Sequence, residues 1–228
     1  MSQYRNRTPI PLAVDCIIFG FHDGNLELLL VHREIEPDIG KPSLMGGFVE
    51  PEEDLSKAAE RVLHKLTGLQ HGYLEQVMAF GDVGRDSVER VVSIVYYALI
   101  RKEQYDQELV KKHNAKWYPL NELPDMMFDH KDMVSIALER LRLKVKTEPL
   151  GFNLLPPKFT QSQIQELYEA ILGEELDKRN FRKKLTSMEF LVKLDEKDKT
   201  GSKRGAFLYE FDQEKYRSLS KQGFGFKV

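Results

Sequence analysis

Apolar and polar positions alternate in strand-like and helix-like patterns over roughly the first 145 residues of the chain. Residues 14–21 and 26–31 are rich in β-branched and large apolar side chains, and Asp23-Gly24-Asn25 between them is a hairpin signal. Apolar residues recur three and four positions apart over residues 55–66, which predicts a helix that ends at Gly68. The pattern therefore begins with a β-hairpin and a helix.

The mixture of elements continues along this part of the chain. Residues 91–100 form another strand-like run, and residues 117–124 are predicted as a loop. Asp129 is predicted to cap a helix with one apolar face. That face is formed by Val134, Ala137, Leu138, Leu141 and Val145. Strands and helices mixed in this way predict an α/β or α+β domain.

The remaining residues are predicted to form two helices followed by two strands. Thr160 and Gln163 are a capping-box signature at the start of a helix that runs through Leu172. A second helix is expected over residues 175–188, with strands over residues 190–194 and 206–211. Residues 195–205 form a polar loop between the strands, and this loop contains Lys197, Lys199, Lys203 and Arg204.

A segment rich in proline, residues 147–159, separates these two patterns. We place the domain boundary there, with one domain over residues 1–148 and a second over residues 149–228. From Gly151 onward the sequence has 15 basic and 12 acidic residues, whereas the part before it has 19 basic and 24 acidic residues. Opposite net charges predict different functions for the two domains.

Composition narrows the class of protein. Of the 228 residues, 41% are hydrophobic and 31% are charged, which is enough apolar material for packed cores. Cys16 is the one cysteine, so an intrachain disulfide and a cysteine-based zinc cluster are excluded. No stretch approaches the ~20 apolar residues of a membrane span, and the N-terminus lacks the apolar segment of a signal peptide. We expect a cytoplasmic protein that does not enter membranes.

The most specific motif lies between Gly47 and Leu69. Five residues separate Gly47 from Glu53, seven more separate Glu53 from Arg61, and Gly68 and Leu69 follow. This spacing resembles the Nudix box, G-x5-E-x7-R-E-U-x-E-E-x-G-U, where U is a bulky apolar residue. The resemblance covers most of residues 10–145. It implies an α/β/α sandwich in which the box is a loop, a helix and a loop.

Three glutamates of the Nudix box are replaced in this chain, by Val62, Lys65 and Leu66. In active members of the family these glutamates hold the divalent metal that neutralises a diphosphate and activates water. Their replacement predicts a retained ligand pocket without a metal site, catalytic residues or a cofactor. Glu53 and Arg61 are expected to pair with each other in a structural role.

The second domain resembles a winged helix-turn-helix. Phe181, Leu185 and Met188 have the spacing of one buried helix face, so the cations between them are expected to face outward. Such a charged face is usually only solvated, but the second basic cluster, in the loop between the strands, favours DNA. The candidate DNA-binding residues are Lys178, Arg179, Asn180, Arg182, Lys183, Lys184 and Thr186 in the helix, and Lys199, Lys203 and Arg204 in the loop.

A Nudix-like domain followed by a winged helix resembles the Nudix-related transcriptional regulators of bacteria, the NrtR and AraR type. Segments that also carry this resemblance include Trp117-Tyr118-Pro119-Leu120 and Leu155-Pro156-Pro157-Lys158-Phe159-Thr160. The resemblance implies an α+β fold, with a Nudix α/β/α sandwich before a small winged-helix DNA-binding domain. It also implies a homodimer that binds double-stranded DNA at a palindromic operator and responds to a small metabolite.

The resemblance implies ADP-ribose or a sugar as the effector. Much of the family has Trp-x-Leu-Pro-Gly-Gly at the start of the box, where this chain has Pro42-Ser43-Leu44-Met45-Gly46-Gly47. The missing tryptophan removes an aromatic wall, which slightly favours a pentose such as arabinose. The candidate effector-binding residues are His32, Arg33, Gly46, Gly47, Glu53, Lys65, Asp82, Arg85, Asp86 and Arg90.

Two other functions stay open at this point. A Nudix hydrolase of ADP-ribose or a related nucleoside diphosphate derivative could use displaced metal ligands among Glu50, Glu52, Glu53 and Glu60. A protein-interaction adaptor could instead offer its basic helix to an acidic partner. We favour the regulator, and we expect residues 149–157 and the helix after Asp129 to couple its two sites.

Overall fold

The computed structural model describes residues 8–34, 36, 38–69, 72–102, 107–200 and 204–222. The chain divides into two compact units. The first unit consists of Met1–Phe19, Leu28–Ala98 and Gln104–Ala137, and the second of Gly20–Glu27, Leu99–Glu103 and Leu138–Val228. Within the described ranges, no helix is long and apolar enough to cross a membrane.

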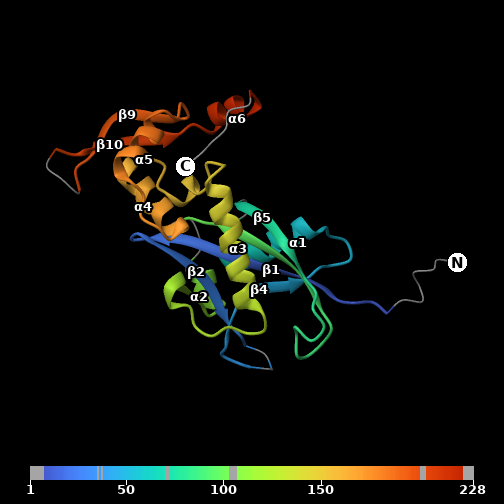
Figure 1. Ribbon diagram of the computed structural model, residues 1–228. Coiled ribbons are helices and arrows are strands. Elements are labelled where there is room, and N and C mark those ends of the chain that lie inside the picture. The colour runs from blue at the N-terminus through green and yellow to red at the C-terminus, as the bar shows by residue number, and fades with distance from the viewer. Residues whose placement is uncertain are drawn as a thin grey trace. The chain divides into compact units, whose positions relative to one another are not determined.

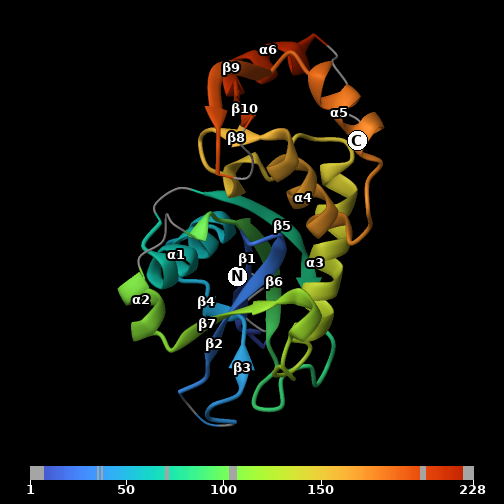
Figure 2. The ribbon, with the colours of Figure 1, turned by 90° about the vertical axis from the view of Figure 1, so that its left-hand side faces the viewer.

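A seven-stranded sheet forms the centre of the first unit (Figure 1). Its strands are β1 (Leu12–His22), β2 (Asn25–His32), β3 (Pro42–Ser43), β4 (Met45–Phe48), β5 (Tyr73–Phe80), β6 (Val92–Leu99) and β7 (Ala115–Pro119). The main order is β3-β2-β1-β6-β5, while β4 pairs with β1 and β7 pairs with β2. Figure 2 shows helix α1 (Leu55–Thr67) on one side of the sheet and the first half of α3 (His130–Val145) on the other. The predicted mixture of strands and helices is confirmed.

The hairpin predicted near the N-terminus is present. Asp23 and Gly24 adopt φ angles of 47° and 76°, so both occupy the left-handed region that a tight two-residue hairpin turn requires. Glycine adopts this region without steric cost, and aspartate is one of the few other residues that tolerate it. The strands that the turn joins are each longer than the apolar runs that predicted them.

Helix α1 begins and ends where its sequence predicts. The side chain of Asp54 accepts a hydrogen bond from the backbone amide of Lys57, which caps the first turn. Gly68, at φ 74°, donates its amide to the carbonyl of His64 and ends the helix in the left-handed conformation. The predicted apolar face is buried at Ala59, Val62, Leu63 and Leu66.

Several elements of the first unit were not predicted. β5 is an edge strand that is half-buried, with Met78 44% exposed, so it lacks the apolar run of an interior strand. Helix α2 (Gln107–Lys112) is only six residues long. The predicted loop over residues 117–124 is wrong at its start, because β7 continues through Pro119 by pairing with β2.

Helix α3 carries the predicted apolar face. Val134, Ala137, Leu141 and Val145 are all at most 3% exposed. The helix starts directly after Asp129, as expected, but the Asp129 carboxylate accepts hydrogen bonds from Arg85, 44 positions earlier in the chain. A long-range ion pair therefore uses the side chain that was predicted to cap the helix.

The second unit contains a helical pair and a three-stranded sheet. Its elements are η4 (Phe152–Leu154), β8 (Phe159–Thr160), α4 (Gln161–Leu172), α5 (Lys178–Thr186), β9 (Leu191–Asp198), β10 (Ala206–Phe211) and α6 (Gln213–Lys221), with strand order β8-β10-β9. Its core is strongly aromatic. Phe152 stacks on Phe211 with ring centroids 4.8 Å apart, and Phe190 packs against Phe211 edge to face.

The elements of this unit differ from the prediction in several places. The capping box of Thr160 and Gln163 is confirmed, but α5 begins only at Lys178 because Asp177 caps it. β9 extends four residues beyond the predicted strand, so Lys197 lies in the strand rather than in the loop. β8 and α6 were not predicted.

The proline-rich segment over residues 147–159 is folded. Phe152, Leu154 and Leu155 are at most 6% exposed, and the first two belong to the short helix η4. Gly151, at φ 89°, supplies the left-handed turn that starts η4. This segment is therefore part of the second unit's core, although its sequence suggested a break in regular structure.

Candidate effector site and DNA-binding surface

The retained residues of the Nudix box form a closed hydrogen-bonded group. The Arg61 guanidinium donates to both carboxylate oxygens of Glu53, at 3.0 and 2.5 Å, and to the carbonyl of Phe48 at 2.8 Å. Glu53 also accepts from the amide of Glu50. The hydrogen bonds from Arg61 and Glu50 lower the pKa of Glu53 to about 2. The predicted pairing of Glu53 with Arg61 is confirmed.

The three altered positions of the box lie on two different faces of α1. Val62 and Leu66 are 1% and 0% exposed and pack in the core, whereas Lys65 is exposed. The side chains at these two positions are aliphatic, so neither offers an oxygen ligand to a cation. Across the described residues, no group of three or more His, Cys, Asp or Glu side chains is arranged to hold a metal ion.

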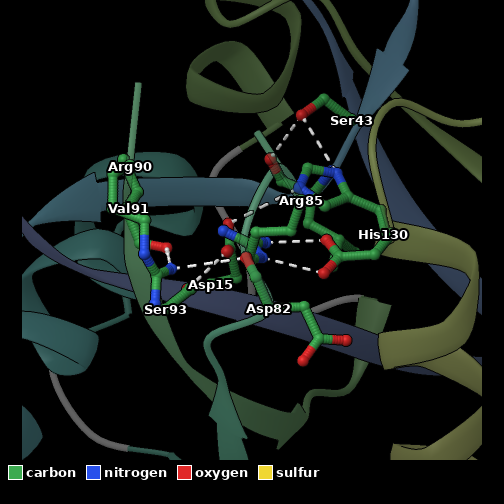
Figure 3. A network of polar contacts seen from close by, with 10 residues as sticks. Asp15, Ser43, Asp82, Arg85, Arg90, Val91, Ser93 and His130 are labelled. Atoms are coloured by element: carbon green, nitrogen blue, oxygen red, sulfur yellow. Dashed lines mark hydrogen bonds and ion pairs between the residues drawn. The ribbon is translucent and has the colours of Figure 1, made fainter. Parts of the chain in front are cut away.

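A buried polar network lies beside the box, around His130 (Figure 3). Ser93 Oγ donates to Asp15 Oδ2 at 2.6 Å, and His130 Nε2 lies 4.0 Å from Asp15 Oδ1. All three residues are less than 9% exposed. Gly46 is needed here, because a Cβ atom at this position would lie 2.4 Å from Asp15 Oδ1. The network therefore packs directly against Gly46, the residue that precedes the first glycine of the box.

The geometry indicates the protonation state of His130. Its Nδ1 accepts a hydrogen bond from the backbone amide of Leu44 at 3.1 Å, so Nδ1 carries a lone pair and no proton. The proton of the neutral ring is then on Nε2, which faces Asp15. Burial lowers the pKa of His130, while the carboxylates of Asp15 and Asp129 oppose that shift.

Arg85 joins the loop between β5 and β6 to the start of α3. Its guanidinium donates to both carboxylate oxygens of Asp129, at 2.8 and 2.7 Å, and the two side chains are 5% and 20% exposed. Arg90 holds the same loop through the carbonyls of Gly81, Asp82 and Val91. Arg85 and Arg90 were predicted to bind the effector, but in this structure both guanidinium groups hold the loop.

The end of β2 brings two further candidates near this network. His32 has both ring nitrogens engaged, Nδ1 with the carbonyl of Asn114 at 2.9 Å and Nε2 with the hydroxyl of Tyr118 at 3.1 Å. The Arg33 guanidinium lies 6.0 Å from the ring centroid of Phe128, and that ring packs edge to face on His130. Arg33, a predicted effector-binding residue, is therefore connected to His130 through the ring of Phe128.

The ten predicted effector-binding residues fall into three groups. Gly47, Glu53 and Lys65 belong to the box and α1. Asp82, Arg85, Asp86 and Arg90 share the loop before β6, where Asp86 accepts a hydrogen bond from the amide of Val88. His32, Arg33 and Gly46 lie at the end of β2 and in β4.

Sequence reasoning missed the centre of the network. Asp15, Ser43, Ser93, Phe128 and Asp129 were not assigned to the site, and neither was His130, which is buried. A lone carboxylate within the apolar run of β1 was the one available signal for Asp15.

Helix α5 presents its cations to solvent. Phe181, Leu185 and Met188 are 4%, 2% and 6% exposed, which confirms the predicted buried face. The candidates Lys178, Arg179, Asn180, Arg182, Lys183, Lys184 and Thr186 are all exposed. Among the residues that the structure describes, no carboxylate forms an ion pair with any of the five cations of α5.

The hairpin between β9 and β10 carries the second basic cluster. Lys199 and Arg204 are exposed, and Lys203 lies outside the described residues. Asp198 accepts hydrogen bonds from the amide and the hydroxyl of Thr200, which shapes the turn and lowers the pKa of its carboxyl group. The predicted placement of Lys199 and Arg204 beyond the strands is confirmed.

Comparison with known families and proteins covers both parts of the chain. The NUDIX domain family matches residues 9–136, and the family described as NrtR DNA-binding winged helix domain matches residues 151–211. The ADPR responsive transcriptional repressor NtrR of Acinetobacter baylyi is 36% identical over 222 residues, which cover 95% of this chain and 88% of that protein. This chain belongs to the NrtR family.

Solved NrtR structures are similar in fold. The crystal structure of Shewanella oneidensis NrtR complexed with a 27mer DNA covers 94% of this chain and 97% of its own, with 28% identity and a TM-score of 0.80. The cocrystal structure of the NUDIX domain of the same protein with ADP ribose covers 62% of this chain and 94% of its own, with 28% identity and a TM-score of 0.50. The predicted NrtR-type fold, a Nudix domain followed by a winged helix, is confirmed.

Proposed function

We propose that this chain is a DNA-binding transcriptional repressor whose Nudix domain senses ADP-ribose without hydrolysing it. The observation that carries the proposal is the state of α5. Its five cations are exposed, and within the described part of the chain none of them is neutralised by a carboxylate. A helix whose apolar face is buried and whose basic face is free is suited to contact phosphates and base edges in the major groove.

The proposed effector is ADP-ribose rather than a pentose. The repressor of A. baylyi is ADPR responsive, and the Nudix domain of S. oneidensis NrtR was crystallised with ADP ribose. The slight preference for arabinose in the sequence finds no support among these relatives. Among the predicted effector-binding residues, Arg33, Lys65 and Asp82 are the first that we propose to contact ADP-ribose. Arg85 and Arg90 would have to give up their present hydrogen bonds to reach a phosphate.

We infer that the loss of hydrolysis follows from the altered box. A catalytic Nudix site needs several carboxylates around its metal ion, but positions 62 and 66 contribute buried aliphatic side chains and position 65 an exposed ammonium. Glu53 is held by Arg61. The hydrolase that remained open from the sequence is therefore the weaker alternative.

We further propose that the protein is a homodimer and that its two domains have separate binding functions. We assign effector binding to residues 1–148 and operator binding to residues 149–228, with Lys178, Arg179, Asn180 and Arg182 as the first contacts in the groove. A homodimer would present two such helices to a palindrome whose half-sites lie about one helical turn, ~34 Å, apart. Sedimentation of the free chain tests the dimer directly.

The decisive experiment is an electrophoretic shift with DNA fragments from upstream of the gene for this chain and of its neighbours. We expect a shift that ADP-ribose releases and that arabinose and other pentoses leave unchanged. Failure of the folded protein to shift any fragment at low salt would overturn the repressor. Release by a pentose alone would overturn the proposed effector and keep the repressor.

A parallel assay tests whether the protein hydrolyses ADP-ribose. The protein is incubated with ADP-ribose and Mg²⁺ or Mn²⁺, and the products are separated to detect AMP and ribose 5-phosphate. We expect neither product. Turnover that scales with the protein concentration would establish the hydrolase and overturn the assignment of a purely sensing Nudix domain.

A further inference from the structure

An exposed phenylalanine on the second unit's hairpin is flanked by two lysines. Phe207 of β10 is 38% exposed. Lys193 Nζ lies 3.6 Å and Lys197 Nζ lies 4.5 Å from the centroid of its ring. Both distances are within the range in which an ammonium is attracted to the negative face of an aromatic ring.

The strand register explains why these three side chains meet. Phe207 is paired with Lys197 across the antiparallel ladder, and Tyr209 is paired with Lys193. Lys193 and Lys197 are four positions apart on β9, so they share one face of the sheet. An irregularity between Phe207 and Tyr209 shifts the register there, and the Phe207 ring lies within reach of both lysines.

The two ammonium groups have no carboxylate partner among the residues described here. Other lysines of this unit do form ion pairs, for example Lys158 with Glu196 and Lys215 with Glu189. Asp195 lies between Lys193 and Lys197 on the same face of β9, yet it forms no ion pair with either of them. Two like charges gathered on one ring repel each other, and an anion that contacts both would relieve that repulsion.

We propose that Phe207 is a positioning residue for DNA binding, whose ring holds the ammonium groups of Lys193 and Lys197 against backbone phosphates. This inference rests on the proposed DNA binding and extends it to three residues outside the candidate set. The ring attracts each cation and restricts its long side chain, so less conformational entropy is lost when a phosphate binds. Lys193 and Lys197 thereby extend the basic cluster of the hairpin, with Lys199 and Arg204, along β9.

The test measures binding of a fluorescein-labelled duplex of mixed sequence, about three helical turns long (~30 base pairs), by anisotropy at several salt concentrations. Phosphate contacts are independent of sequence, so the operator need not be known. Each phosphate contact contributes about 0.9 to the slope of log affinity against log salt concentration. The Lys193→Ala/Lys197→Ala variant is expected to lose roughly two units of that slope.

Substitutions at Phe207 separate positioning from simple packing. Phe207→Leu keeps an apolar side chain but removes the aromatic face, and we expect about two- to fivefold weaker binding. Phe207→Tyr keeps the ring and should bind like the unmodified chain. Lys215→Ala is the matched control, because that ammonium already pairs with Glu189, and its salt slope should not change.

The outcomes are distinguishable. If the unmodified chain binds the duplex and Arg179→Ala weakens that binding, but the double lysine variant keeps the full slope, only this inference fails. Phe207→Leu that binds as tightly as Phe207→Tyr would likewise overturn the positioning role. If the unmodified chain binds no DNA, the proposed repressor fails first. Circular dichroism of each variant confirms that it is folded.

Discussion

Three arginines of the first unit and the cations of α5 in the second unit are used in opposite ways. In the first unit, Arg61 and Arg85 each hold a carboxylate through two hydrogen bonds, and Arg90 holds three backbone carbonyls. In the second unit, the cations of α5 are exposed, and no described carboxylate pairs with them. The same residue types therefore stabilise the fold in one region and remain available to a ligand in the other.

This difference shows that a basic residue in a motif is not evidence of a binding role until its partners are known. Arg85 and Arg179 are equally cationic in the sequence, but only Arg179 has its charge open to solvent.

The largest effect is expected from placing a carboxylate on the buried face of α1, at a position where the Nudix box has a glutamate. Leu66→Glu should lower the free energy of unfolding by roughly 3–5 kcal/mol, since it leaves a buried charge without a partner. Urea unfolding measures this change. Lys65→Glu is the control on the same helix, where the side chain is exposed and the change should stay within about 0.5 kcal/mol. Equal stability of the two variants would show that position 66 is open to a metal ligand after all.

Removing a paired arginine should have the next largest effect. Arg85→Ala leaves the Asp129 carboxylate, 20% exposed, without its partner, and we expect a loss of about 3 kcal/mol in unfolding free energy. Lys111→Ala provides the contrast in the same unit, because its pair with Glu108 is largely exposed and should contribute below about 1 kcal/mol. A negligible loss for Arg85→Ala would return this residue to the list of free phosphate ligands.

Removing an unpaired arginine should weaken DNA binding and leave the stability of the fold almost unchanged. Arg179→Ala is expected to weaken operator binding by about 1–3 kcal/mol while the unfolding free energy changes by less than about 0.5 kcal/mol. Arg217 on α6 is also exposed. The Arg217→Ala variant therefore tests whether loss of any exposed cation of the second unit weakens DNA binding to the same extent. Equal weakening by both substitutions would replace a specific helix surface with a general electrostatic attraction.

The smallest expected effect is a pH dependence from His130. Burial lowers its pKa in the folded protein below the ordinary value of 6.5, so below that pH the unfolded chain takes up a proton more readily. Its contribution to stability is complete above pH 6.5 and is lost as the pH falls toward the folded pKa. Asp15 and Asp129 reduce the shift, which keeps the effect small.

Thermal unfolding between neutral and mildly acidic pH measures this dependence. His130→Gln should remove the His130 contribution to it, and His22→Gln, a histidine substitution at a half-exposed position, is the control. A profile that is identical in His130→Gln and the unmodified chain would mean that His130 does not stay neutral in the folded protein.

The turns and helix ends could be predicted because their chemistry is local. Asp23-Gly24 determines a tight hairpin, Gly68 ends α1, and Thr160 with Gln163 starts α4, each through contacts within a few residues. The buried face of α5 was predictable for the same reason, since helical periodicity alone brings Phe181 and Leu185 together. These features hold regardless of what packs around them.

Elements that depend on a distant partner were missed or misplaced. β5 has little apolar pattern of its own and is defined by pairing with β6, and β7 extends into a predicted loop because β2 pairs with it. The proline-rich segment over residues 147–159 looked like a break in regular structure, but Phe152 stacks on Phe211, which lies far away in the chain.

The sequence by itself determined the family, the replacement of the box glutamates and the basic, amphipathic character of α5. Only the tertiary structure decided which charges are free. Neutralising a cation requires a carboxylate brought to it from elsewhere, as Asp129 is brought to Arg85, and burial then makes that pair costly to break. No local pattern reports such a partner, because charge pairing depends on distance in space and not on distance along the chain.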